Sequence, residues 1–170
     1  MSAGGPIVPR FGIGYDVHQL QSGRKMVIGG VEIEHDRGPL GHSDADVLAH
    51  AITDALLGAA ACGDIGSHFP DTDPKWKGAD SIELLVASVG IIAAAGFRPW
   101  NVDATVNLER PKVAPHRDLM RERLAAAIGV PVDRMSVKAT RGEGLGPIGR
   151  EEGIAAYAVA SIIPLEARSV

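Results

Sequence analysis

The sequence YDVHQL at residues 15–20 and the sequence GHSDADVLAH at residues 41–50 predict a strand followed by a helix, with candidate metal ligands on both. On a strand, Asp16 and His18 are two positions apart, so their side chains leave the same face. His50 lies on the predicted helix and can supply a third ligand. One carboxylate and two imidazoles, with a coordination position left open, are typical of a catalytic zinc site. The same spacing also occurs in solvated strand ends and in buried, hydrogen-bonded histidines.

The other predicted elements follow one another in no regular order. Strands are predicted at residues 11–18, 26–34, 101–108, 135–140 and 153–163, and helices from Ser43 to about Ala61, from Asp80 to about Ala95 and from Pro115 to Gly129. Within the second strand, Gly29 and Gly30 suggest a bulge or bend. This order predicts an α+β fold, with helices on one face of a mixed sheet of about four main strands. Residues 1–170 are expected to form one domain, with residues 1–10 as an N-terminal extension.

The helix expected from Ser43 carries a stripe of polar residues. Ser43 and Asp46 resemble a capping box that would begin it. Asp46, His50 and Asp54 follow one another at intervals of four residues and therefore lie along one side of the helix. Such a stripe is either the solvated face of the helix or a set of carboxylates that orient a metal-bound imidazole. Asp54 is the better candidate for orienting His50.

The composition argues against several classes of protein. A chain of 170 residues that is 45% hydrophobic and 4% aromatic can form one domain with an aliphatic core. A net charge of −4 and scattered basic residues argue against binding to nucleic acid. The single cysteine, Cys62, excludes an internal disulfide and a multi-cysteine zinc site. No apolar stretch is long enough to span a membrane, so we expect a soluble, cytoplasmic protein without membrane attachment.

A long loop at residues 63–80, GDIGSHFPDTDPKWKGAD, is rich in carboxylates. Asp64 and Asp71 stand among glycines and prolines, where aspartate side chains often bond nearby backbone amides. Long loops in compact domains are also often functional, and these carboxylates could bind substrate hydroxyls. The composition does not decide between the two interpretations.

A second loop, KATRGEGLGPIGREEG at residues 138–153, is rich in glycine. Its spacing fits neither a P-loop nor the dinucleotide-binding fingerprint. Its backbone amides, with Thr140, Arg141 and Arg150, could approach phosphate oxygens, and Glu143 could bind a hard metal ion. A flexible hairpin without a ligand is the alternative.

Taken together, the motifs resemble those of the 2-C-methyl-D-erythritol 2,4-cyclodiphosphate synthase family. The resemblance extends from about residue 11 to residue 163 through YDVHQL, IGGVEI, GHSDADVLAHAITDALLGAAACGDIG, FPDTDPKWKGADS, RPKVAPH and GREEGIA. It implies an α+β homotrimer with active sites between adjacent subunits. It also implies conversion of 4-diphosphocytidyl-2-C-methyl-D-erythritol 2-phosphate to the cyclic diphosphate and CMP, in the non-mevalonate route to isoprenoid precursors.

The resemblance implies roles for particular residues as well. It makes Asp16, His18 and His50 the ligands of zinc, and Glu143 the ligand of a second ion, Mg²⁺ or Mn²⁺. His42 and Thr140 are implied in catalysis, and the other implied substrate contacts are Ser43 at the 2-phosphate, Asp64 at the methylerythritol hydroxyls, Asp71 in the same loop, Lys112 at the cytidine, Ala139 at the diphosphate, and Arg141 and Arg150.

The chain departs from the family pattern at two positions. The family commonly has a second threonine after Thr140, where this chain has Arg141, which could contact phosphate in its place or point to solvent. Glu151 replaces a glycine, which affects the local conformation. Two other classes of function remain open. One is a zinc-dependent phosphohydrolase, and the other is a non-catalytic trimer that binds an isoprenoid diphosphate in an axial cavity.

Overall fold

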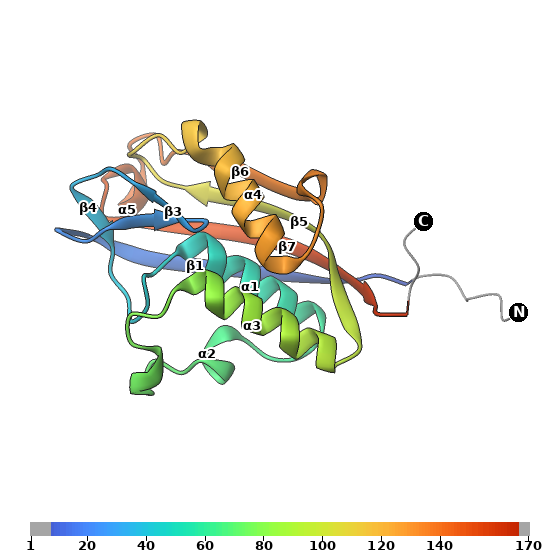
Figure 1. The fold of residues 1–170 in the computed structure, drawn as a ribbon. Coiled ribbons are helices and arrows are strands. Elements are labelled where there is room, and N and C mark those ends of the chain that lie inside the picture. Colours follow the sequence, from blue (N-terminus) through green and yellow to red (C-terminus); the bar gives the residue numbers. More distant parts are fainter. Residues whose placement is uncertain (1–7, 167–170) are drawn as a thin grey trace, which may run out of the picture.

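A five-stranded mixed sheet forms the centre of the protein, which a computed structural model describes for residues 8–166 (Figure 1). The strand order is β4-β1-β7-β5-β6, where the strands are β1 (Arg10–Ser22), β4 (Arg37–Pro39), β5 (Phe97–Asn107), β6 (Met135–Thr140) and β7 (Gly153–Pro164). Only the β5–β6 pair in this sheet is parallel. The sequence prediction missed β4 and so gave about four main strands. The extension predicted over residues 1–10 lies mostly outside the described residues.

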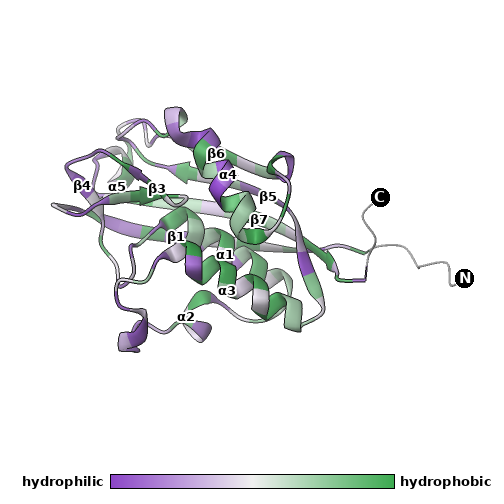
Figure 2. Ribbon diagram, viewed as in Figure 1, coloured by the Kyte–Doolittle hydropathy of each residue, from purple (hydrophilic) through white to green (hydrophobic). Residues whose placement is uncertain are grey.

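Three helices cover one face of this sheet, as predicted for an α+β fold (Figure 1). They are α1 (Val47–Ala59), α3 (Ser81–Ala94) and α4 (Arg117–Ile128), and two short helices, α2 (Ile65–His68) and α5 (Gly146–Gly149), lie in the loops. Figure 2 shows that α1 and α3 are largely hydrophobic. Both pack into the aliphatic core between helices and sheet. Within residues 8–166, no helix combines the length and the apolar composition that a membrane span requires.

Several predicted boundaries are confirmed and others are wrong. The strand predicted at residues 135–140 matches β6, Asp80 caps α3, and Gly129 ends α4 with a left-handed φ of 72°. In contrast, α1 begins only at Val47, with Asp46 as its N-cap. The capping box predicted from Ser43 is therefore wrong.

The N-cap of α1 also fixes a neighbouring hairpin. Strands β2 (Met26–Ile28) and β3 (Val31–Ile33) pair antiparallel, so Gly29 and Gly30, where a bulge or bend was predicted, form a hairpin turn that divides the predicted strand in two. Asp46 accepts hydrogen bonds from the amides of Gly29 at 2.9 Å and Gly30 at 2.6 Å. Burial raises the pKa of this carboxyl, although the backbone donors oppose the shift. One buried side chain thus joins the hairpin to the start of α1.

Strand β1 lies directly on the backbone of α1 because two of its inward-facing residues lack a side chain. A β-carbon on Gly12 would lie 2.0 Å from the carbonyl oxygen of Ala55, and one on Gly14 would lie 1.9 Å from that of Ala51. Neither distance leaves room for a methyl group. The close approach places the next inward-facing residue of β1, Asp16, beside the first turn of the helix.

The opposite face of β1 and β7 is apolar and exposed. We call it the open sheet face, and it consists of Phe11, Ile13, Tyr15, Val17, Tyr157 and Val159, each about half exposed or more. Tyr15 and Tyr157 are register partners, with ring centroids 4.7 Å apart. Contiguous apolar surface of this kind marks an interaction site. The inward-facing residues of β7 are buried against the core, so this strand is apolar on both faces.

Candidate metal and substrate site

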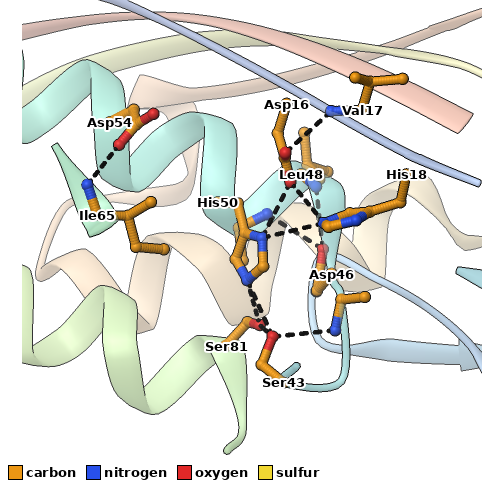
Figure 3. A network of polar contacts seen from close by, with 12 residues as sticks. Asp16, Val17, His18, Ser43, Asp46, Leu48, His50, Asp54, Ile65 and Ser81 are labelled. Carbon is orange, nitrogen blue, oxygen red and sulfur yellow. Dashed lines mark hydrogen bonds and ion pairs between the residues drawn. The ribbon is translucent and has the colours of Figure 1, made fainter. Parts of the chain in front are cut away.

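Three predicted ligands converge where β1 meets α1 (Figure 3). Asp16 Oδ2 lies 3.0 Å from His18 Nε2 and 2.9 Å from His50 Nδ1, and the two ring nitrogens are 3.4 Å apart. All three ligand atoms lie within 4.8 Å of one another. A carboxylate oxygen and two ring nitrogens this close together can direct their lone pairs at one point. A cation at that point would stabilise the arrangement. This donor set fits zinc, with room for a further ligand.

The electrostatics of the three side chains are strongly coupled. Burial opposes ionisation of Asp16, but hydrogen bonds to His18 and His50, together with their charges, hold the pKa of its carboxyl well below the usual range. Burial alone would lower the pKa of His50, yet the hydrogen bond and charge of Asp16 raise it above 6.5. Without metal, the ionised carboxylate of Asp16 therefore stabilises the protonated form of the His50 imidazole relative to a free imidazole.

The outer nitrogen of His50 contacts two serines rather than the predicted aspartate. His50 Nε2 lies 2.8 Å from Ser81 Oγ and 3.2 Å from Ser43 Oγ (Figure 3). Asp54 instead accepts a hydrogen bond from the backbone amide of Ile65 at 2.7 Å. The contact with His50 Nε2 that was predicted for Asp54 is therefore made by Ser81 and Ser43, and the effect of Asp54 on the metal site stays a prediction. Sequence reasoning missed Ser81 because it lies 31 positions after His50 and carries no metal-site signature.

A cavity of about 490 Å³ opens beside the three ligands. His42, Ser43 and Asp71 line it together with apolar side chains of the 63–80 loop, so these three predicted site residues lie around one cavity. Among the described residues, none hydrogen-bonds the buried Nε2 atom of His42, so this atom can receive a ligand.

Asp64 has a local role in this structure. Its side chain caps α2 by accepting hydrogen bonds from Ser67 N at 2.9 Å and Ser67 Oγ at 2.6 Å. The Ser67 hydroxyl and amide lower the pKa of this carboxyl. Of the two interpretations of the loop aspartates, turn chemistry therefore describes Asp64 here, whereas Asp71 lines the cavity.

A second, smaller cavity of about 150 Å³ lies between the loop after β5 and the end of β6. Four of the residues expected near the nucleotide and diphosphate line it, namely Lys112, Ala139, Thr140 and Arg141. We call it the nucleotide-side cavity, and we call the cavity beside the three ligands the metal-side cavity. The two cavities share no lining residue. Within one chain, the two groups of predicted site residues therefore form separate cavities.

The charged residues around the second cavity are paired with one another. Arg141 Nη2 lies 3.3 Å from both carboxylate oxygens of Glu143, and Arg141 Nη1 lies 4.0 Å from Glu109. Glu151 Oε1 lies 3.5 Å from Arg110 Nε, and its φ of 59° is in the region that favours glycine. The two residues that depart from the family pattern, Arg141 and Glu151, thus form ion pairs with two consecutive residues of the loop after β5.

Arg150 lies outside both cavities. Its guanidinium bonds Glu152 at 2.8 and 3.1 Å. The hydrogen bond to Arg150 lowers the pKa of the Glu152 carboxyl. No described contact ties Arg150 to either cavity.

Comparison with protein families places these features in a known group. The model of the YgbB family matches residues 9–163, which include every predicted metal ligand and both cavities. The chain belongs to the YgbB family. This family member is 61% identical over 153 residues to a protein of Salinibacter ruber named 2-C-methyl-D-erythritol 2,4-cyclodiphosphate synthase. The match covers 90% of this chain and 98% of that relative.

Solved structures agree with the assignment to the YgbB family. A 2C-methyl-D-erythritol-2,4-cyclodiphosphate synthase in a CDP-bound form is 37% identical, with a TM-score of 0.83, and the match covers 90% of this chain and 99% of the other. The bifunctional IspDF from Campylobacter jejuni is 39% identical, with a TM-score of 0.90. That match covers 94% of this chain but only 43% of the bifunctional protein.

Proposed function

We propose that the protein is a 2-C-methyl-D-erythritol 2,4-cyclodiphosphate synthase. It would convert 4-diphosphocytidyl-2-C-methyl-D-erythritol 2-phosphate to the cyclic diphosphate with release of CMP. The observation that carries this proposal is the convergence of Asp16, His18 and His50 beside a cavity that also contains His42 and Ser43. The full-length relatives that bear this name support the same reaction.

The metal-side cavity supplies positioning for the attacking phosphate. Zinc held by Asp16, His18 and His50 would act as a Lewis acid toward phosphate oxygens. The unpartnered Nε2 of His42 and the hydroxyl of Ser43 can bind the 2-phosphate of the substrate. One oxygen of this phosphate attacks the β-phosphorus, and the bond from that phosphorus to the CMP oxygen breaks. The attacking oxygen is already ionised, so no side chain needs to accept a proton.

The nucleotide-side cavity would hold the leaving group. Lys112 and the backbone of residues 108–114 would bind cytidine, while Ala139 and Thr140 line the path of the diphosphate. Arg141 would contact the phosphates, and Glu143 would hold Mg²⁺ or Mn²⁺, which neutralises charge on the departing CMP. Positioning should contribute most of the rate because the ring closure is intramolecular. Asp64 would exchange its bonds to Ser67 for substrate hydroxyls.

A homotrimer would bring the two cavities together. They are separate within one chain, and the open sheet face needs cover that the described residues do not supply. Packing three open sheet faces around an axis would bury this surface and pair the metal side of one subunit with the nucleotide side of the next. Arg150 would then lie near the axis, where an isoprenoid diphosphate is a predicted additional ligand.

The chemical outcome of the reaction tests the proposed function. Purified protein incubated with the substrate in water enriched in ¹⁸O should release CMP and a cyclic diphosphate without ¹⁸O, and a chelator should stop the reaction. A zinc phosphohydrolase would instead give a linear product that contains ¹⁸O. Substrate binding without CMP release would support the non-catalytic trimer.

A further inference from the structure

Behind the metal ligands, a chain of hydrogen bonds leads away from the cavity. Ser81 is the first residue of α3, and its side chain is fully buried. Ser81 Oγ lies 2.8 Å from His50 Nε2 and donates a short hydrogen bond to Asp44 Oδ1. The other oxygen of Asp44 accepts from the Ser81 amide at 3.2 Å. We call Asp44, Ser81 and His50 the serine relay.

When His50 is neutral, the hydrogen bonds of the serine relay can run in only one direction, from His50 to Ser81 and from Ser81 to Asp44. An ionised carboxylate can only accept hydrogen bonds, so the single O–H of Ser81 points to Asp44. Ser81 Oγ must then accept from His50, which places the proton on Nε2. The Nδ1 atom is left with its lone pair, and this atom faces Asp16 and His18. The relay therefore selects the imidazole tautomer that can bind a metal through Nδ1.

Ser43 does not replace Ser81 in this role. Its hydroxyl oxygen lies 3.2 Å from His50 Nε2, farther than Ser81 Oγ, and already accepts a hydrogen bond from the Ala45 amide at 3.1 Å. Ser43 also lines the cavity, where the proposed substrate binds, whereas the cavity lining does not include Ser81. The histidine thus has one serine toward the substrate and another serine toward the protein interior.

The relay also connects the metal ligands to the long loop. Ser81 follows directly after residues 63–80, and the end of that loop is fastened to the segment that carries His42. The amide of Gly78 donates to the carbonyl of His42 at 2.8 Å, and the amide of Asp44 donates to the carbonyl of Ala79 at 3.1 Å. A shift of the loop end would therefore move Ser81 and Asp44 together, and with them the hydrogen bond to His50.

We propose that Ser81, held by Asp44, is a positioning residue for the metal site. It acts through His50 by fixing the tautomer and the ring orientation, and it makes metal affinity depend on the position of the loop end. Outer hydrogen-bond partners of metal-bound histidines commonly have this effect. This inference rests on the proposed role of His50 as a zinc ligand, but it does not depend on the identity of the substrate.

The test is metal affinity in Ser81→Ala, measured by competition with a chromogenic chelator. We expect zinc to bind about 10–100-fold more weakly, as after loss of other outer partners. Ser88→Ala is the matched control. It removes another fully buried hydroxyl of α3, which donates to the carbonyl of Leu84 at 2.8 Å and has no bond to the metal ligands. Its zinc affinity should equal that of the unaltered protein.

Two further measurements separate positioning from a general loss of stability. In the cobalt-loaded protein, Ser81→Ala should change the visible absorption bands of the metal, and the His50 Nε2 proton should exchange faster with water. Asp44→Ala should change both in the same direction, because it frees the Ser81 hydroxyl to rotate. This second variant keeps the test informative if Ser81→Ala does not fold.

Unchanged zinc affinity and cobalt spectra in both relay variants would overturn the proposal. Equal losses in Ser88→Ala would also overturn it, because they would assign the effect to core packing. Failure of the proposed function looks different: the unaltered protein would bind zinc through the relay but release no CMP from the substrate.

Discussion

The metal side and the nucleotide side of the site are built in different ways. Side chains of His50 and His18 are 13% and 20% exposed, and they are held by a strand and a helix that pack in the core. Around the nucleotide-side cavity, the side chains of Arg141 and Glu143 are 54% and 70% exposed, on a loop. Core packing therefore organises the first group before any ligand arrives. The charges of the second group neutralise one another until a ligand or a neighbouring subunit competes for them.

The largest effect should follow removal of a ligand from the organised side. His50→Ala should abolish bound zinc and CMP release while leaving a folded oligomer, because an open coordination site is not what holds the core together. Metal analysis and circular dichroism of the purified variant check this. His116→Ala, which alters a histidine that lines neither cavity, serves as the control for zinc binding. Full zinc occupancy in His50→Ala would refute the assignment.

Mixing variants tests whether the two sides come from different subunits. His50→Ala and Glu143→Ala should each be inactive, but subunit exchange should restore part of the activity because some interfaces then combine two intact halves. Mass spectrometry of the mixture confirms exchange, and CMP release measures the recovery. Confirmed exchange without recovered activity would mean that each subunit holds a complete site.

Arg141 tests whether the ion pairs on the exposed side give way to a ligand. If its guanidinium leaves Glu143 to bind phosphate, Arg141→Ala should weaken CDP binding by about 1.5–3 kcal/mol, the range for hydrogen bonds to charged groups. If it remains paired or solvated, the change should stay within about 0.5 kcal/mol. Calorimetric titration with CDP distinguishes the two results, and Lys25→Ala provides a control, because it removes an exposed cation that pairs with Glu32 and lines neither cavity.

The pH dependence of zinc binding tests the interaction between Asp16 and His50 on the metal side. Because Asp16 raises the pKa of His50 above 6.5, the protonated imidazole persists to a higher pH than in an unfolded chain, and zinc must displace that proton. Zinc affinity should therefore rise with pH up to this raised pKa and fall by about tenfold for each unit below it. Competition titrations at a series of pH values measure the slope. An affinity that is constant from pH 6.5 downwards would contradict the coupling.

Asp54 should give the smallest effect on the metal. Its hydrogen bond goes to the amide of Ile65 at the start of α2, so Asp54→Asn should leave zinc affinity almost unchanged while loosening the loop. Hydrogen exchange of the Ile65 amide and zinc competition measure the two effects separately. A zinc affinity lowered by about tenfold or more would return Asp54 to the surroundings of the metal.

Sequence patterns predicted what short-range geometry determines. The two-residue spacing of Asp16 and His18 places both side chains on one face of a strand, and the predicted β6 agrees with the observed strand because the alternation there is simple. Ser81 could not be found in this way, because its bond to His50 depends on how α3 packs against α1. The same limit applies to Asp54, whose position one helical turn from His50 predicted a contact with that histidine, whereas its carboxylate accepts a hydrogen bond from the amide of Ile65.

The roles carried over from the family resemblance had a different basis. Position in a motif identified His42 and Lys112, and the structure places these residues in cavities, but the pairing of Arg141 with Glu143 could not be predicted because this chain departs from the pattern there. A departure removes the information that a motif provides. Only the surrounding charges then indicate what the new side chain does.

The absence of side chains at Gly12 and Gly14 sets the distance between β1 and α1, and with it the distances between the metal ligands. Zinc bonds to nitrogen and oxygen are about 2.0–2.2 Å long and tolerate deviations of about 0.2 Å. A methyl group at residue 14 would move the strand and the helix apart by more than this tolerance, since its carbon would otherwise lie 1.9 Å from the Ala51 carbonyl oxygen. A variant with an alanine there would keep all three ligands and still lose the geometry that lets them share one ion. Inactive relatives could therefore arise through apolar changes that leave every ligand intact.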